Sequence, residues 1–123
     1  MLQSYLSFPL VGNQIEISLF QPQHFFDGTL DSMMKHRAGI MAWSPLGGGK
    51  FLAGENESSR RVLDGIHESC SKAPATASQL LLAWLLRHPG NIFPVMTATK
   101  PERIIESVRA LDIKLDRQDW FEC

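Results

Sequence analysis

The sequence AWSPLGGG, residues 42–49, decides how the fold of this chain is interpreted. A short β-type run ends here, and three consecutive glycines follow it directly. Glycine carries no Cβ, so the backbone amides of such a loop can approach an anion closely. A flexible loop explains the glycines equally well, because the stretch matches neither a P-loop nor the Gly-x-Gly-x-x-Gly motif. The stretch therefore predicts the end of a strand and a candidate anion site.

Short β-type runs alternate with helical stretches on both sides of this sequence. Strands are predicted at residues 13–18, 40–44 and 92–96. Parallel strands need a crossover of a dozen or more residues, and the spacing of the runs provides it. The first crossover is predicted to be a helix that Asp27 caps and Gly39 closes. The pattern predicts a parallel α/β fold.

The second crossover contains two predicted helices. One covers about residues 59–71, and the other covers about residues 77–87. Thr76 and Gln79 form a capping-box pattern at the start of the second helix. Because this helix is apolar nearly all round, we expect it to lie between other layers rather than on a surface. Gly90 supplies the turn that ends it.

The region after the third strand is predicted to be helical as well. Thr99 and Glu102 form a second capping pattern, which opens a helix with apolar residues at helical spacing. Asp116 and Asp119 are placed to start a short terminal turn.

The composition is that of one globular domain, which we expect to cover residues 1–123. Hydrophobic residues make up 44% and charged residues 20%, and the net charge of -1 provides no basic field for nucleic acids or membranes. The two cysteines are too few for a disulfide framework or a metal cluster and indicate reduced cytosolic thiols. No signal pattern is found, and no apolar run approaches the roughly 18 residues of a membrane helix. We expect a cytoplasmic protein that binds no metal, nucleic acid or membrane.

Polar and aromatic residues near the predicted strand ends are candidate ligand contacts. Asn13 and Gln14 are strand amides that suit a carboxamide ligand, or they lie on an exposed edge. Trp43 lies at the carboxyl end of a strand, where sites of parallel sheets form, although core packing is the commoner role. Lys100 and Arg103 lie in the first turn of a helix, where a phosphate is favoured, or they are solvated charges.

Four strings together give the chain a specific resemblance. They are NQIEIS at residues 13–18, DGTLD at 27–31, MAWSPLGGG at 41–49 and PERI at 101–104. Nearly the whole chain resembles the C-terminal part of the aldo-keto reductases, and within them a bacterial oxidoreductase subgroup. That family folds as a (β/α)8 TIM barrel and reduces aldehydes and ketones with a nicotinamide cofactor. The resemblance implies an α/β chain of about three βα units, an incomplete C-terminal portion of such a barrel.

The resemblance also implies which residues bind the cofactor. It implies that Gln14 binds the nicotinamide carboxamide and that Trp43 stacks on the nicotinamide ring. The pyrophosphate is implied to be lined by Ser44, Leu46 and Gly48, with Lys50 near it. The adenosine phosphate is implied to be held by residues 97–99 with Arg103, and the adenine edge by residues 106–107. The implied cofactor-binding residues are Asn13, Gln14, Trp43, Ser44, Leu46, Gly48, Lys50, Thr97, Thr99, Arg103, Glu106 and Ser107.

The chain departs from the family pattern where the phosphorylated cofactor is recognised. Many members have Lys or Gly followed by Ser at the positions of Thr97 and Ala98, and Asn at that of Ser107. Losing that serine hydroxyl removes a phosphate donor, and a charge-assisted hydrogen bond contributes about 1.5–3 kcal/mol. Because the family usually uses the phosphorylated form, the resemblance implies NADP as the cofactor. The lost hydroxyl makes NAD the alternative.

The residues that would complete the chemistry are not expected in this chain. Carbonyl reduction needs a proton donor, which the family supplies as a Tyr tuned by Lys, Asp and His from the first half of the barrel. Tyr5 is the only tyrosine and precedes the first strand, so it does not match that position. The histidines also match no member of this tetrad: His24, His36, His67 and His88. We expect no catalytic residue here, so that the chain alone is inactive and takes a small carbonyl substrate only when the missing half is supplied.

The resemblance and the missing catalytic residues leave two kinds of function. The first is a C-terminal segment of an aldo-keto reductase, from a truncated or partial gene product, that carries the cofactor site without the chemistry. The alternative is a non-catalytic module that associates with a partner chain, or a remnant that only binds a nucleotide. Three of eight strands cannot close a barrel, so apolar faces and strand edges are expected to be exposed.

Overall fold

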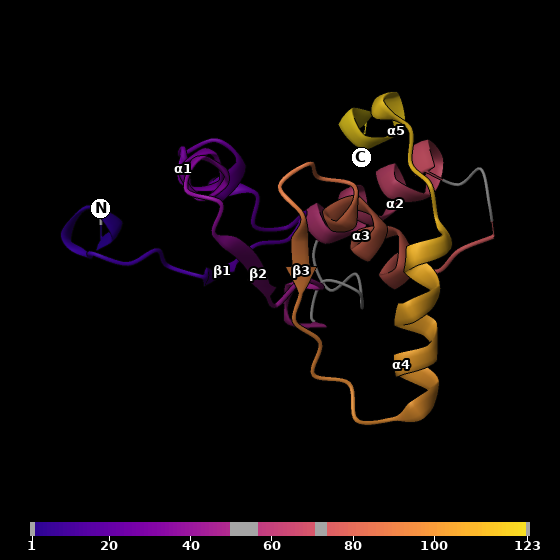
Figure 1. Cartoon of the computed structure of the whole chain (residues 1–123). Helices are drawn as coiled ribbons and strands as arrows, with labels where there is room; N and C mark the ends of the chain where they lie inside the picture. Colours follow the sequence, from indigo (N-terminus) through magenta and orange to yellow (C-terminus); the bar gives the residue numbers. More distant parts are fainter. Residues whose placement is uncertain (1, 50–56, 71–73, 123) are drawn as a thin grey trace.

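The computed structural model describes residues 2–49, 57–70 and 74–122 (Figure 1). Within these residues, three strands form one sheet and helices follow each strand. The elements are η1 Leu2–Tyr5, β1 Gly12–Glu16, η2 Gln23–Phe25, α1 Thr29–Lys35, β2 Gly39–Trp43, η3 Gly47–Gly49, α2 Glu57–Cys70, α3 Ala77–Leu86, β3 Ile92–Pro94, α4 Pro101–Val108, η5 Arg109–Asp112 and α5 Arg117–Glu122.

The sheet is parallel, with β2 between β1 and β3. The N–H of Val95 donates to the carbonyl of Ala42 at 2.8 Å, so the pairing continues just past the end of β3. Each strand begins and ends within a few residues of its predicted bounds, and the predicted parallel α/β fold is confirmed.

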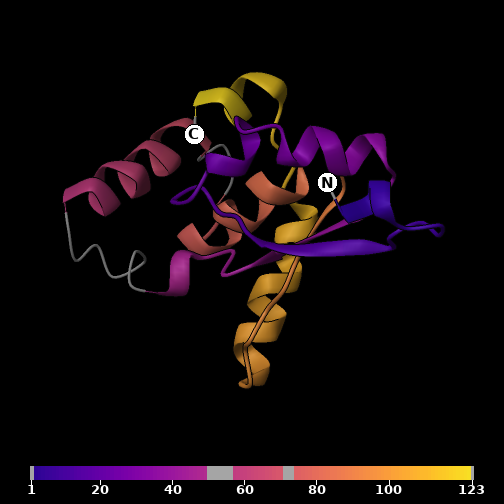
Figure 2. The ribbon, with the colours of Figure 1, turned by 90° about the vertical axis from the view of Figure 1, so that its left-hand side faces the viewer.

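One face of the sheet packs against helices and the other is open. Ile40 and Ala42 of β2 are fully buried and lie in the same core as Ile15 and Ile92 of the neighbouring strands. The alternate positions point the other way, because successive side chains of a strand face opposite sides. On that side Phe93 is 59% exposed. Figure 2, seen from the β1 side, shows α1 above this strand with α3 behind it and α4 running below.

The helix α3 occupies the position expected of an apolar helix. It contacts β3 as well as α2, α4 and η5, and its residues from Gln79 to Leu85 are all buried. The predicted capping box is present: the hydroxyl of Thr76 accepts from the N–H of Gln79 at 3.3 Å, and Oε1 of Gln79 accepts from the N–H of Thr76 at 3.0 Å. This local prediction and the buried position of α3 are confirmed.

The start of α1 differs from the prediction by one residue. The N-cap is Gly28, in the left-handed region at φ 81°, rather than Asp27. Asp27 acts from the preceding position, because its Oδ1 accepts from the N–H of Thr29 at 2.9 Å. Hydrogen bonds from Thr29 hold the pKa of Asp27 below its usual value, and Nδ1 of His24 at 2.8 Å from Oδ2 adds to this effect.

The predicted end of α1 is wrong, whereas the predicted turn after α3 is present. Arg37 at φ 53°, not Gly39, takes the left-handed position after α1, and the N–H of Ala38 reaches back to the carbonyl of Met33 at 2.9 Å. The turn after α3 contains Gly90, as predicted, and the N–H of Asn91 closes it by donating to the carbonyl of His88 at 3.2 Å. Asn91 follows in the left-handed region at φ 51°. A Cβ at Gly90 would lie 2.9 Å from Nδ1 of His88, so that ring would have to shift.

The last two helices show one wrong and one confirmed capping prediction. The N-cap of α4 is Lys100, without a side-chain cap, and Pro101 takes the first helical position, so Thr99 does not cap this helix. Before α5, Oδ1 of Asp116 accepts from the N–H of Asp119 at 2.8 Å, and Oδ2 of Asp119 accepts from the N–H of Asp116 at 3.2 Å. That reciprocal cap is the predicted one.

Candidate functional site

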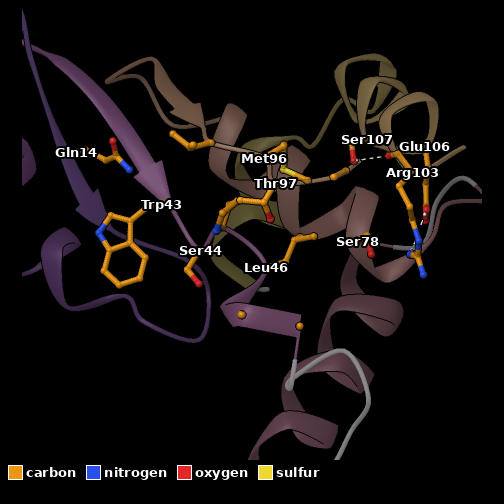
Figure 3. Close-up of a pocket in the computed structure, with 15 residues that line it drawn as sticks. Gln14, Trp43, Ser44, Leu46, Ser78, Met96, Thr97, Arg103, Glu106 and Ser107 are labelled. Carbon is orange, nitrogen blue, oxygen red and sulfur yellow. Dashed lines mark hydrogen bonds and ion pairs between the residues drawn. The ribbon is translucent and has the colours of Figure 1, made fainter. Parts of the chain in front are cut away.

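A pocket of about 480 Å³ lies beyond the carboxyl ends of the strands. This edge of a parallel sheet is where ligands bind in α/β folds, because the loops after the strands converge there. Segments at the ends of all three strands, the start of α3 and the helix α4 contribute to it (Figure 3). Its lining residues are Gln14, Trp43, Ser44, Pro45, Leu46, Gly48, Gly49, Ser78, Val95, Met96, Thr97, Ala98, Arg103, Glu106 and Ser107.

One end of the pocket is formed by the open face of the sheet. Gln14 of β1 and Trp43 at the end of β2 both project from this face (Figure 3). The indole of Trp43 is 42% exposed and takes no part in the buried core. An exposed flat ring beside a carboxamide offers a stacking surface and a hydrogen-bond donor and acceptor to a planar amide ligand.

The middle of the pocket is formed by the loop after β2. Ser44 turns the chain away from the sheet at φ 53°, and the three glycines of η3 follow at φ 64°, 71° and 81°. Such a run of left-handed positions is accessible to glycine and strained for other residues. The backbone of this loop therefore borders the pocket without Cβ atoms at Gly48 and Gly49. This arrangement lets a ligand approach the main chain.

The far end of the pocket is polar and lies at α4. Arg103 and Glu106 are the charged residues among the lining residues of the described chain. Nη1 of Arg103 lies 3.5 Å from Oε2 of Glu106, and the arginine side chain is 66% exposed. The hydroxyl of Ser107 donates to the carbonyl of Arg103 at 2.8 Å, which ties it to its own helix. An exposed guanidinium at a helix start can bind an oxyanion.

The pocket brings together nine of the twelve residues implied by the resemblance. These are Gln14, Trp43, Ser44, Leu46, Gly48, Thr97, Arg103, Glu106 and Ser107. Their common location is a structural finding, whereas their role in binding a cofactor stays a prediction.

Three implied residues are not in this group. Asn13 is neighbour to Gln14 on β1 and faces the opposite side of the sheet, where it lines a different cavity with Gly28 and His36. Thr99 is exposed in the loop before α4 and does not line the pocket. Lys50 lies outside the described residues.

Five lining residues were missed by the sequence reasoning. Pro45 and Gly49 belong to the string quoted first, so adjacency alone could have indicated them. Val95 and Met96 continue the third strand toward Thr97. Ser78 gives no such indication, because it reaches the pocket only through the packing of α3 against α4.

The other titratable candidates lie away from the pocket. Tyr5 is 83% exposed in η1 at the start of the chain, and His24 pairs with Asp27 in the loop before α1. Among the residues that the structure describes, no group of three or more His, Cys, Asp or Glu side chains could hold a metal ion. In the same part of the chain, no helix is long and apolar enough to cross a membrane.

Comparison with known proteins places this geometry in context. The family model "Aldo/keto reductase family" matches residues 3–123. The chain is 39% identical to the uncharacterized oxidoreductase YcsN of Bacillus subtilis and 41% identical to a 6-dehydroglucose reductase of Agrobacterium fabrum. These matches cover 98% and 99% of this chain but 41% and 40% of the relatives. The chain thus spans about two-fifths of the length of these relatives.

Solved structures agree with the sequence relatives. The thermostable aldo-keto reductase Tm1743 aligns with a TM-score of 0.78 and 28% identity, over 96% of this chain and 40% of that one. An aldo-keto reductase from Klebsiella pneumoniae in complex with NADPH aligns with a TM-score of 0.74 and 27% identity, over 91% of this chain and 37% of that one. The predicted resemblance and the partial α/β barrel are confirmed by these matches.

Proposed function

The chain belongs to the aldo/keto reductase family, and from this premise we propose that its pocket binds a nicotinamide dinucleotide as the cofactor-binding part of a carbonyl-reducing oxidoreductase. The observation that carries this proposal is the single pocket shared by three distant segments: Gln14, residues 43–49 and residues 95–107. Each segment offers the chemistry that one part of a dinucleotide requires. The relatives are about two and a half times as long as this chain, so the proposal concerns the cofactor-binding part of the activity.

The nicotinamide is proposed to lie at the sheet end of the pocket. Gln14 hydrogen-bonds its carboxamide, and the exposed face of Trp43 stacks against its ring. Ser44, Leu46 and Gly48 lie along the pyrophosphate, where the left-handed glycines allow close approach of the main chain. The bound dinucleotide supplies the hydride, and these residues orient it.

The adenosine end is proposed to lie against α4. Arg103 binds a phosphate on the ribose, with Thr97 in the loop before the helix, and Glu106 and Ser107 border the adenine. We propose NADP as the preferred cofactor because of Arg103, and NAD as the alternative because Ala98 offers no hydroxyl to the phosphate. The Klebsiella neighbours, which were crystallised with NADPH or with NADP and acetate, support the first choice.

Carbonyl reduction itself is proposed to need residues from elsewhere. A proton donor must lie beside the carbonyl oxygen during hydride transfer. The described residues that line the pocket include no tyrosine, histidine or lysine. We therefore expect this chain alone to bind the cofactor without turning over an aldehyde or ketone.

Titration of the full chain with NADPH tests the proposal. Trp84 and Trp120 are packed against each other away from the pocket, so quenching by a bound nicotinamide should come from exposed Trp43. We expect saturable quenching in the native chain, a clearly smaller amplitude in Trp43→Phe, and binding heat by calorimetry in the native chain. The absence of both quenching and heat in the native chain would exclude the proposal. Turnover of a carbonyl substrate by the pure chain would show that its proton donor is present after all.

A module that pairs with another chain is the second candidate. Met41, Trp43 and Phe93 leave an apolar surface open on the sheet, and α4 adds exposed Ile105 and Val108. Burying apolar area of this extent against complementary strands and helices stabilises a complex. Sedimentation tests this candidate: a concentration-independent monomer that is stable alone would count against it.

A further inference from the structure

The carboxylate of Glu106 is held by a residue that does not line the cofactor pocket. The hydroxyl of Thr76, the N-cap of α3, donates to Oε1 of Glu106 at 2.8 Å. Thirty residues separate these two side chains, so the contact depends entirely on the packing of α3 beside α4. A second bond fixes the main chain, because Nε2 of buried Gln79 donates to the carbonyl of Glu106 at 3.0 Å.

The capping box of α3 therefore has two functions at once. Within the box, Oγ1 of Thr76 and Oε1 of Gln79 accept the backbone N–H groups that begin the helix. The remaining donors of the same side chains, the hydroxyl proton of Thr76 and the amide of Gln79, both point to Glu106. Since every donor and acceptor role is compatible with the others, the arrangement is a connected network.

The second oxygen of Glu106 faces Arg103. Nη1 of Arg103 and Oε2 of Glu106 are 3.5 Å apart, longer than the roughly 2.7–2.9 Å of a full charge-assisted hydrogen bond. The carboxylate is thus bonded tightly to α3 and only loosely to the guanidinium. If Thr76 released it, rotation would allow Glu106 to form the closer, bidentate pair that arginine and carboxylate favour. The positive charge would then be less available to a phosphate in the pocket.

We propose that Thr76 is a positioning residue that holds the carboxylate of Glu106 against the start of α3. The guanidinium of Arg103 thereby stays available to a phosphate, which sets the preference for a dinucleotide that carries a ribose phosphate. This inference rests on the proposed cofactor site. It concerns only the phosphorylated form, because the guanidinium has no comparable partner on the unphosphorylated one.

Three substitutions of Thr76 separate this role from helix capping. Thr76→Val removes the hydroxyl, so both the cap and the Glu106 contact are lost. Thr76→Ser keeps both, and Thr76→Asp keeps a strong cap while repelling the carboxylate. The quantity measured is the ratio of the NADP+ and NAD+ dissociation constants of the full chain, by calorimetry at one salt concentration.

The expected ratios follow from the network. Thr76→Val should lower the preference for NADP+ on the order of three- to tenfold, Thr76→Asp should lower it at least as much, and Thr76→Ser should keep the native ratio. A purely structural role of Thr76 would instead weaken the binding of NADP+ and NAD+ equally. Alternatively, it would change the ratio of their dissociation constants in Thr76→Val and leave the native ratio in Thr76→Asp. Either result overturns the inference while leaving the cofactor site intact.

Failure of the proposed cofactor site can be told apart from failure of the role of Thr76. If the native chain binds neither dinucleotide, the proposed function fails and this inference fails with it. A ligand-free measurement gives independent evidence: the Nε–Hε resonance of Arg103 should shift in Thr76→Val and Thr76→Asp and return to its native position in Thr76→Ser. An unchanged resonance in all three variants contradicts the coupling of Thr76 to Arg103.

Discussion

Trp84 and Trp120 exchange hydrogen bonds with each other's backbone. The indole N–H of Trp84 donates to the carbonyl of Trp120 at 3.0 Å, and that of Trp120 donates to the carbonyl of Trp84 at 2.9 Å. The rings stack with centroids 5.1 Å apart and planes at 4°. Both residues lie in the last turn of their helices, where carbonyls have no amide partner four residues ahead. The pair therefore gives one carbonyl at the end of each helix a hydrogen-bond donor, and it joins α5 to α3.

Replacing Trp120 with Phe should destabilise the chain by about 1–3 kcal/mol, because the carbonyl of Trp84 loses its donor while an aromatic ring is kept. Urea denaturation followed by circular dichroism measures this change. Trp43→Phe is the matched control, since Trp43 lies outside the core, and we expect it to change the free energy of unfolding by less than about 0.5 kcal/mol. Equal effects of the two substitutions would show that the exchanged bonds do not stabilise the fold.

Local rules predicted the parts of the fold that depend on a few neighbouring residues. The cap of α3 by Thr76 and Gln79 and the reciprocal pair of Asp116 and Asp119 each lie within four residues, and both are confirmed. The spacing of the strands likewise predicted that they run parallel. The capping prediction at Thr99 was wrong because two local rules compete there. Pro101 occupies the first helical position of α4, which makes Lys100 the N-cap and leaves Thr99 in the preceding loop.

The two-residue period of a strand already places Asn13 and Gln14 on opposite faces, so the strand prediction itself could have separated them. Long-range relationships were not accessible from the sequence in this way. The contact of Thr76 with Glu106 requires knowing that α3 and α4 pack side by side. The resemblance grouped most pocket residues correctly because it carried information about this packing that periodicity lacks.

His88 should make the chain less stable in mild acid. Burial lowers the pKa of His88, while Asp31 opposes this effect, and Nδ1 accepts from the N–H of Gly90 at 3.1 Å, which requires the neutral ring. With a folded pKa below the unfolded value of about 6.5, the unfolded chain binds more protons in this range. The stabilising contribution is present above about pH 6.5 and is lost as pH falls through the lower folded pKa.

Unfolding in urea across pH 8 to pH 5 measures this dependence. His88→Gln should give a flatter profile than the native chain, whereas His67→Gln, which removes an exposed imidazole from α2, should retain the native slope. A native profile that is flat across this interval, or one equally steep in His88→Gln, would contradict the assignment.

Two glycine substitutions should act in opposite directions. Gly65 lies inside α2 with open space around its Cβ position, so Gly65→Ala should stabilise the chain by about 0.4–1 kcal/mol through a lower entropy of the unfolded state. Gly48 has φ 71°, so Gly48→Ala should cost about 1–2 kcal/mol in stability or move the loop away from the pocket. Thermal unfolding compares the two variants, and NADPH titration of Gly48→Ala should show weaker binding. Stabilisation by both substitutions would mean that the loop at Gly48 adopts another conformation in solution.

Arg103 should discriminate between the two forms of the cofactor, and Arg109 is its matched control. Both are exposed arginines in neighbouring turns, but only Arg103 lines the pocket. Charge-assisted bonds to a phosphate contribute about 1.5–3 kcal/mol, so Arg103→Met should weaken NADP+ binding by about 10- to 150-fold while NAD+ binding changes by less than about threefold. Arg109→Met should leave both affinities at their native values. Because Met keeps most of the apolar stem of Arg, a change in NADP+ affinity reports on the lost charge rather than on packing. If Arg103→Met weakened the binding of NADP+ and NAD+ equally, the ribose phosphate would lie away from this guanidinium. If Arg103→Met and Arg109→Met weakened NADP+ binding equally, the effect would be diffuse electrostatics rather than a site.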